Sequence, residues 1–390
     1  MTCETKIDTR LVRPAEMAEP DRAGWEALRQ LHPLGQSPLL SPAFAEAIAE
    51  VRRDVRVVIA RQAGRVVACM AVHVRPFGFA RPVGAPFDDL AGPLIAPECG
   101  LTVSELIKMA GLSAYQAKGA IVIGDEAPAE ATAPYVIDAR GTDGEAYLET
   151  RRKAHPKRFK NFRRLQNKLT REKGEVAFGW GRPDAPDLRQ LLAWKSEQFT
   201  RDGLLDVTRA THSRAILDKI ASLAPEDAAA FGGFMVTLRC KGELIAGHFG
   251  VREGAHFHPW ISAYRPDFAD YAPGMVLLKR VVGSMAEMGL ETYQLADGHG
   301  HYKKYFATEA APIAPVSVTA PGLAGAVHAA SHTGWRLIGA ARANSAGARL
   351  MRRLDHIAVC EPGMVTRAKQ FAYAVAKRSR TPGGSGAAEA

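Results

Sequence analysis

Long hydrophobic runs are missing from this chain. Hydrophobic residues make up 47% of its 390 residues, yet no segment approaches the roughly 18 consecutive apolar residues that a membrane-spanning helix needs. The first residues, Met1–Lys6, have no apolar stretch of the kind that a secretory signal peptide carries. The composition is typical of a globular protein, and we expect to find it in the cytoplasm.

Cysteine is also sparse. The five cysteines are odd in number, widely scattered and free of any Cys-x-x-Cys pair, which argues against a disulfide framework and against a zinc ribbon. The pairs His256/His258 and His299/His301 have no matching Cys or acidic pair that would complete a recognisable ligand set. We therefore expect reduced thiols and no bound metal.

Acidic residues are the minority among the charged ones. The chain has 41 Asp and Glu against 51 Lys and Arg, so its formal net charge is +10. The excess is concentrated in residues 151–173, where Glu172 is the one acidic residue. The cations of this segment are Arg151, Arg152, Lys153, Lys157, Arg158, Lys160, Arg163, Arg164, Lys168, Arg171 and Lys173.

Two interpretations of this basic segment stay open. One is a solvated helix whose apolar residues pack inward, namely Phe159, Phe162, Leu165 and Leu169. The other is a wall that attracts anions, such as nucleotide phosphates, a lipid-linked sugar phosphate or an acidic membrane surface. Nucleic acid is the least favoured partner, because no aromatic platform is interleaved with the cations.

A first α/β unit is predicted from residue 10 to residue 125. Ser41-Pro42 is a helix start, and two apolar segments flank the turn Ala63-Gly64. The expected elements are a helix to Val51, strands Arg56–Arg61 and Val66–Val74, a helix Val103–Lys118 and a strand Ile121–Gly124. The loop Pro86–Leu90 either lines a shared cleft or is a solvated acidic turn, and we favour the turn.

The segment Phe231–Thr308 organises the second half of the chain. Turn signals at Lys241–Glu243 and Glu253-Gly254 separate three apolar segments, which predicts an antiparallel meander. The predicted strands are Phe234–Arg239, Leu244–Val251 and His256–Tyr264, followed by a helix from Ala272-Pro273-Gly274, a short strand Tyr293–Ala296 and a polar tail Asp297–Lys304.

The Pro-Gly helix start suits an anionic ligand. Backbone N–H groups at a helix N-terminus have no intrahelical partner, and the positive end of the helix dipole lies there. Glycine lets a ligand approach the backbone closely. The same pattern also begins many helices for packing reasons alone, so it does not identify a ligand by itself.

The order of these elements resembles the GNAT superfamily of acyl-CoA N-acyltransferases. Within it, the sequence is most similar to the CelD/BcsL-like acetyltransferases of cellulose biosynthesis, which are related to the Fem aminoacyl transferases. The resemblance runs from about Leu148 to Ala310. The residues that carry it are Ala246–Gly250, Trp260–Tyr264, Pro273-Gly274, Asp297-Gly298, Tyr302-Lys303, Trp194–Phe199 and Gly203.

The resemblance implies a binding site for acetyl-CoA as acyl donor. Its pyrophosphate is expected on the helix start, at Pro273, Gly274, Met275 and Val276, with Lys303 able to pair with a phosphate. The oxyanion is expected to receive a backbone N–H between Ser262 and Tyr264, where the family's fourth strand splays.

The same resemblance suggests how protons move. Asp297 is expected to bind the acceptor or act as base, with His299 as the second choice and His248 and His301 as further candidates. Tyr302 and Tyr264 are the candidates to protonate the thiolate that leaves.

The predicted fold class is α/β with mixed sheets, arranged as tandem GNAT-like domains with a helical C-terminal extension. We expect a degenerate N-terminal domain at 10–145, which shapes the acceptor side, and an acyltransferase domain at 146–319. A basic amphipathic extension is expected at 320–380 and a disordered tail at 381–390. The extension either lies on an anionic membrane surface or packs on the protein.

Three functions follow from these expectations. The favoured one is N-acetylation of an amino sugar, free or lipid-linked, in exopolysaccharide or holdfast-type adhesin synthesis. A second is aminoacyl transfer to a cell-wall precursor, as in Fem enzymes. The third is a non-catalytic, membrane-associated effector that binds a nucleotide regulator through arginines near Arg352-Arg353.

Overall fold

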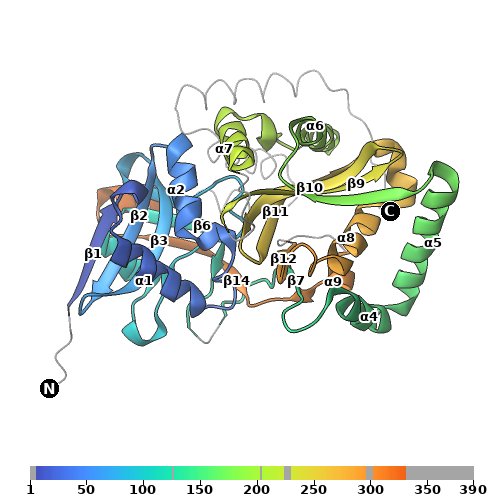
Figure 1. Ribbon diagram of the computed structural model, residues 1–390. Helices are drawn as coiled ribbons and strands as arrows, with labels where there is room; N and C mark the ends of the chain where they lie inside the picture. Colours follow the sequence, from blue (N-terminus) through green and yellow to red (C-terminus); the bar gives the residue numbers. More distant parts are fainter. Residues whose placement is uncertain (1–5, 125–126, 203, 224–229, 296–301, 331–390) are drawn as a thin grey trace.

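Two mixed sheets lie side by side in the computed structural model (Figure 1). The structure describes residues 6–124, 127–202, 204–223, 230–295 and 302–330. Each sheet is mainly antiparallel with one parallel pairing, β4 with β6 in the first sheet and β11 with β12 in the second. The predicted class, α/β with mixed sheets, is confirmed. The expected extension beyond residue 330 and the tail lie outside the described residues.

The first sheet has the strand order β1-β2-β3-β4-β6-β14, with β5 paired to β3. Its strands are β1 (Ile7–Val12), β2 (Val55–Gln62), β3 (Arg65–Val74), β4 (Phe79–Pro82), β5 (Leu94–Ile95), β6 (Ala114–Ile121) and β14 (Ile313–Thr319). The helices of this half are α1 (Glu19–Gln30), α2 (Pro42–Val51) and α3 (Val103–Met109). The predicted start of α2 is confirmed, since the Ser41 hydroxyl accepts the N–H of Phe44 at 3.1 Å.

The helix predicted at Val103–Lys118 is wrong in its second part. The α3 helix ends at Met109, and Gly111 follows with a φ of +70°, a left-handed conformation that commonly ends helices. The strand β6 then begins at Ala114, well before the predicted Ile121. Both faces of this central strand are buried, as at Tyr115 and Ala120, so it shows no clean alternation of polar and apolar residues.

The second sheet has the strand order β13-β7-β12-β11-β10-β9-β8. Its strands are β7 (Tyr135–Asp138), β8 (Val176–Gly181), β9 (Gly232–Cys240), β10 (Glu243–Glu253), β11 (His256–Tyr264), β12 (Thr292–Gln294) and β13 (Thr308–Glu309). The accompanying helices are α4 (Gly144–Ala154), α5 (Pro156–Lys173), α6 (Ala185–Arg201), α7 (Thr211–Ser222), α8 (Pro273–Gly283) and α9 (Lys303–Phe306). The predicted meander is confirmed as β9–β10–β11.

The basic segment forms two helices where the sequence predicted one continuous helix. The break is at His155, whose backbone is not helical (φ −131°, ψ 54°), and Pro156 begins α5 because proline needs no amide hydrogen at that position. Phe159 and Leu169 of α5 are buried, whereas the cations point mainly to solvent. Figure 1 shows α5 at the outer edge of the molecule.

The two halves repeat one order of elements and exchange a strand. β7 follows the first half in sequence but pairs with β12 of the second sheet, and β14 follows the second half but pairs with β6 of the first sheet. The expected domain boundary between residues 145 and 146 therefore assigns β7 to the first half by sequence, although β7 pairs within the second sheet. Each sheet needs a strand from the other half to be complete.

A shared core joins the halves. One buried cluster extends from Phe44 of α2 to Ile216 of α7 and Phe249 of β10. Trp260 of β11 stacks on Phe87 of the first half with ring centroids 4.9 Å apart. Continuous burial of this kind stabilises the two halves as one packed unit.

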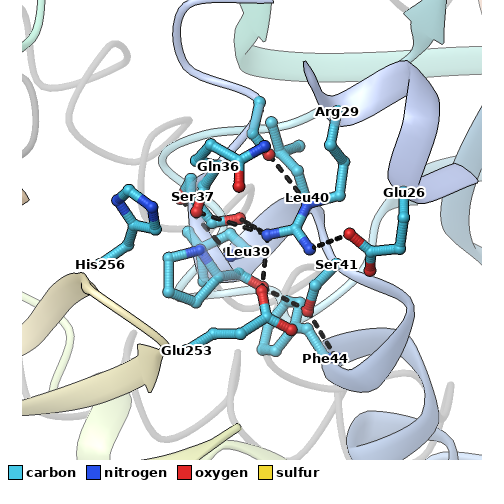
Figure 2. A network of polar contacts seen from close by, with 12 residues as sticks. Glu26, Arg29, Gln36, Ser37, Leu39, Leu40, Ser41, Phe44, Glu253 and His256 are labelled. Carbon is cyan, nitrogen blue, oxygen red and sulfur yellow. Dashed lines mark hydrogen bonds and ion pairs between the residues drawn. The ribbon is translucent and has the colours of Figure 1, made fainter. Parts of the chain in front are cut away.

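Arg29 of α1 adds a polar connection between the halves (Figure 2). Its guanidinium is nearly fully buried and donates to the Gly35 carbonyl at 2.9 Å, to Glu26 at 2.7 Å and to Glu253 at the end of β10 at 2.5 Å. Burial raises the pKa of Glu253, while the Arg29 charge opposes that shift. The ion pair thus holds two buried charges that would each be costly alone.

None of the described helices is both long enough and apolar enough to cross a membrane.

Candidate active site

The parallel strands β11 and β12 form a fork in the second sheet. They pair only at His256 with Thr292 and at Phe257 with Tyr293, although β11 continues to Tyr264. Beyond Phe257 this edge of β11 has no partner in β12. The divergence expected from the sequence is present, and its role in binding an oxyanion stays a prediction.

A bulge in β11 lies within the fork. The register with β10 shifts so that Phe249 faces Ile261 while Gly250 faces Pro259, which leaves Trp260 without an opposite residue. A Cβ atom at Gly250 would lie 2.1 Å from the His258 carbonyl oxygen, so only glycine fits. The bulge brings Trp260 against Phe87 in the first half.

The start of α8 offers one free amide of the three that the sequence suggested. The amides of Met275 and Val276 already donate to the Ala272 carbonyl, at 2.9 and 3.3 Å. Pro273 has no amide hydrogen, and among the described residues the Gly274 amide has no hydrogen-bond acceptor. Apart from the adjoining chain, no atom of the described residues lies within 4 Å of the position where a Cβ of Gly274 would stand, so the described part of the chain leaves room for a ligand there.

Cations of α5 flank this helix start. The ammonium groups of Lys168 and Lys173 lie 5.0 and 5.7 Å from the ring centre of Tyr271, two residues before Pro273. Tyr271 in turn donates a hydrogen bond to Glu172 at 3.0 Å, which ties α5 to the turn. Two ammonium groups and the Glu172 carboxylate therefore lie close to the turn before α8, and the ammonium groups add to the attraction of the helix dipole for an anion.

A buried polar pair lies on β10 and β12, next to the fork. His248 Nδ1 and the Tyr293 hydroxyl are 2.5 Å apart, and both side chains are buried. Burial, assisted by the charge of Lys195, lowers the pKa of His248 to about 3, and burial raises the pKa of Tyr293. His248 is therefore neutral near pH 7 and too weak a base to take a proton from an amine.

Lys195 of α6 lies beside β11 at the fork. Its ammonium donates to the carbonyl of Ser262 at 3.4 Å and to Gln198 at 3.2 Å. Burial, assisted by the charge of Lys303, lowers the pKa of Lys195. A cation held beside the backbone of β11 can stabilise negative charge that develops within the fork.

The structure brings some of the predicted residues together. Tyr302 and Lys303, at the start of α9, lie close enough to Tyr293 and Lys195 for their charges to act on the pKa values of those groups. Burial raises the pKa of Tyr302, so its phenol keeps its proton until a strong base forms beside it. Tyr264 is exposed at the end of β11, on the strand face of Ser262.

The remaining predicted residues, Asp297, His299 and His301, lie outside the described residues. Within the described ranges, no three His, Cys, Asp or Glu side chains gather in a way that could hold a metal ion. Lys195 also lies beside the fork, although the sequence pattern did not single it out as a candidate. Lys195 follows Leu191 by four residues and Leu192 by three, so it places a charge in the apolar stripe of α6. This charge is the signal in the sequence that could have identified Lys195 as a candidate.

Residues 156–304 match the family described as "Acetyltransferase (GNAT) domain". This range begins with α5, includes the whole fork and ends in α9. Residues 156–304 are therefore similar to a GNAT acetyltransferase domain, and the chain is an acyltransferase of the class that takes its acyl group from acetyl-CoA. The predicted superfamily, activity class and acyl donor are thereby confirmed, while the resemblance to CelD/BcsL-like enzymes stays a prediction.

Three solved structures have a similar course of the chain. FemX has a TM-score of 0.49 at 11% identity and covers 79% of this chain and 97% of its own. A tandem GNAT protein from the clavulanic acid biosynthesis pathway has a TM-score of 0.45 at 11% identity, covering 82% and 100%. The C-terminal domain of a putative lysylphosphatidylglycerol synthetase from Agrobacterium fabrum has a TM-score of 0.44 at 13% identity, covering 82% and 96%.

These TM-scores and sequence identities are too low to assign the substrate of any of the three proteins to this chain. Comparison with curated proteins gives no match.

Proposed function

We propose that the chain transfers the acetyl group of acetyl-CoA to the primary amine of an amino sugar, in the synthesis of an exopolysaccharide or holdfast-type adhesin. The observation that carries this proposal is the fork between β11 and β12, with α8 starting at the open Gly274, inside the range that matches a GNAT domain. The choice of an amino sugar rests on the sequence resemblance to CelD/BcsL-like enzymes.

The proposal assigns roles to the residues around the fork. The Gly274 amide and the α5 cations bind the phosphates of the donor, and Lys303 supplies further positive charge. A β11 amide near Ser262, with Lys195 beside it, stabilises the oxyanion as the amine attacks the thioester carbonyl. Tyr302, rather than the exposed Tyr264, protonates the thiolate that leaves, and Asp297 or His299 takes the proton from the amine.

The acceptor is further proposed to carry phosphate, as a nucleotide-linked or lipid-linked sugar does. The exposed cations of α5 favour this because they continue beyond the start of α8, at Lys157, Lys160 and Arg164. An anionic membrane surface would meet the same cations, and the protein would then work at the inner face of the cell membrane.

A product assay tests the proposal. The full chain is incubated with acetyl-CoA and with glucosamine, galactosamine or their nucleotide-diphosphate forms, and the release of CoA thiol is followed together with product mass. We expect thiol release that depends on the amine and a product heavier by one acetyl group. N-acetylglucosamine, whose amine is blocked, is the control and should give only background release.

Thiol release that no amine accelerates would contradict the proposal. Transfer from aminoacyl-tRNA, with none from acetyl-CoA, would instead establish the Fem-like alternative.

A further inference from the structure

The two sheets repeat one arrangement of strands around a parallel pair. The order β1-β2-β3-β4-β6-β14 of the first sheet corresponds to β8-β9-β10-β11-β12-β7 of the second, so β4 and β6 take the places of β11 and β12. Each of these two pairs is parallel, and a helix, α3 or α8, lies between its strands in sequence. β4 and β6 pair only at Phe79 with Ala114 and at Ala80 with Tyr115, although β6 continues to Ile121. The first sheet therefore has a fork of its own, which we call the first-sheet fork.

The chain itself fills the first-sheet fork with residues 89–95, the filling segment. Ala91 in this segment forms a parallel bridge with Ala120 of β6. The Ala91 amide donates to the Gly119 carbonyl at 2.8 Å, and the Ile121 amide donates to the Ala91 carbonyl at 2.9 Å. Backbone groups of β6 that the divergence from β4 leaves without a strand partner are thus satisfied by the chain's own backbone.

Further contacts hold the filling segment on both sides. Its strand β5 pairs with β3, and on the opposite side the Tyr115 hydroxyl of β6 donates to the Gly92 carbonyl at 2.8 Å. A Cβ atom at Gly119 would lie 2.2 Å from the Asp89 carbonyl oxygen, so the backbone of the segment lies directly on β6. Ala91 and Leu94 belong to the buried core of the first half. A ligand could enter the first-sheet fork only by displacing this packed segment.

The start of α3 is likewise occupied by a side chain of the protein. The Thr102 hydroxyl oxygen accepts the Glu105 amide at 3.2 Å, and the Glu105 carboxylate accepts the Thr102 amide at 2.9 Å and its hydroxyl at 2.7 Å. These hydrogen bonds lower the pKa of Glu105 below its ordinary value, so the carboxylate is charged near pH 7. A negative charge fixed at the helix start suits the helix dipole and repels a phosphate group.

The start of α8 differs from the start of α3 in both respects. It has no side-chain cap and no acidic residue in its first turn, and the Gly274 amide has no acceptor among the described residues. Within the described ranges, no strand pairs with β11 on the β12 side beyond Phe257. The two halves thus share one plan, and the first half has filled the places that the second half leaves without such partners.

We propose that the first-sheet fork is the counterpart of a donor site that the chain occupies with its own backbone, so that each chain binds one acetyl-CoA, in its second half. The proposal rests on the proposed function for the position of the donor at the start of α8. A donor in the first half would have to break the hydrogen bonds of Ala91 and expose Leu94, and the Glu105 carboxylate would oppose its phosphates.

The stoichiometry of donor binding tests this proposal. Acetyl-CoA is titrated calorimetrically into the full chain, whose concentration is fixed by amino-acid analysis. We expect one molecule bound per chain, and no binding in a folded Gly274→Glu variant. Glu105→Gln is the matched control, because it removes the carboxylate at the start of α3 but keeps the filling segment. It should bind one acetyl-CoA with the affinity of wild type.

Hydrogen exchange locates the bound molecule and tests the filled fork in the free protein. The amides of Ala91 and Ile121 donate within the first-sheet fork, so they should exchange slowly without ligand and at the same rate with it. Amides at the start of α8 should exchange about tenfold more slowly at roughly ten times the dissociation constant of acetyl-CoA.

Two results would overturn the proposal. One is two molecules of acetyl-CoA per chain, and the other is a change in exchange at Ala91 and Ile121 when the donor binds. If amine-dependent release of CoA thiol is present in either case, the proposed function stands. If wild type binds no acetyl-CoA, the proposed function fails together with the count of one. Slow exchange at Ala91 and Ile121 would then still support the filled fork, and fast exchange there would contradict it.

Discussion

The titratable residues around the fork are controlled mainly by burial. His248, Tyr293 and Tyr302 are all held in their neutral forms, and the pKa of Lys195 is lowered in the same way. The burial of Lys195 strengthens its interaction with any negative charge formed beside it.

The burial of His248 predicts a loss of stability in acid. The unfolded chain binds a proton at this residue near its ordinary pKa of 6.5, whereas the folded protein does so only at about 3. The contribution of His248 to the free energy of unfolding is therefore fully present above pH 6.5 and declines as the pH falls toward 3. In His248→Gln neither state titrates, so on going from pH 7 to pH 5 the unfolding free energy should fall by about 1–2 kcal/mol less than in wild type.

Urea unfolding at the two pH values measures this difference. Tyr293→Phe is the matched control, because it removes the hydroxyl near His248 but leaves the buried imidazole, so it should retain the acid sensitivity of wild type. Equal losses in wild type and His248→Gln would show that His248 does not carry the effect.

Single residues were predictable from sequence only where a local motif marked them. Tyr302 and Lys303 belong to such motifs and lie close to Tyr293 and Lys195, and the roles of these residues and of Gly274 stay predictions. Asp89 and His258 are far apart in sequence, and only the packing of the two halves brings them together. The sequence favoured a solvated turn for Pro86–Leu90, but the structure places this loop against Trp260.

At the level of elements, the meander and its bulge determine the shape of the fork. The turn signals before β10 and β11 gave these strands correctly, because hairpins have local sequence signatures. The end of α3 and the start of β6 were missed because a buried central strand reads like a helix segment when its residues are apolar on both faces. The break before α5 was marked by Pro156, a signal that the charge pattern obscured.

The bulge makes a specific prediction at Gly250. In Gly250→Ala the new methyl group would lie 2.1 Å from the His258 carbonyl and 2.6 Å from Pro259 Cα, so the backbone of β11 must shift. We expect a loss of stability of about 1–3 kcal/mol, the usual range for overpacking, together with weaker acetyl-CoA binding. Chemical unfolding and ligand titration of the purified variant measure both effects.

Gly274→Ala is the matched control for this prediction. Apart from the adjoining chain, no atom of the described residues lies within 4 Å of its added methyl group, and the position is in a helix, so stability should stay within about 1 kcal/mol of wild type. A Gly250→Ala protein as stable as Gly274→Ala would show that the bulge can relax and does not define the fork.

At the scale of the whole molecule, the two halves act as one unit. They share a core, the Arg29–Glu253 ion pair and an exchanged pair of strands, β7 and β14. The sequence predicted the duplicated order of elements, because each half has its own hairpins and helices. It did not predict the exchange, since strand pairing across halves depends on long-range contacts that local patterns do not encode.

We propose that the second half binds acetyl-CoA at the start of α8. A thermal-shift titration with acetyl-CoA on wild type, Gly274→Ala and Gly274→Glu tests it most directly. Saturating ligand, at about a hundred times its dissociation constant, should stabilise wild type by roughly 2.7 kcal/mol. Gly274→Glu should fold, because the site is open and a carboxylate suits a helix N-terminus, but its charge should repel the phosphates.

We expect a saturable shift in wild type that Gly274→Ala largely keeps and that a folded Gly274→Glu loses. A wild-type protein that acetyl-CoA does not stabilise, or a Gly274→Glu protein that it stabilises as strongly as wild type, would show that the donor does not bind at the start of α8.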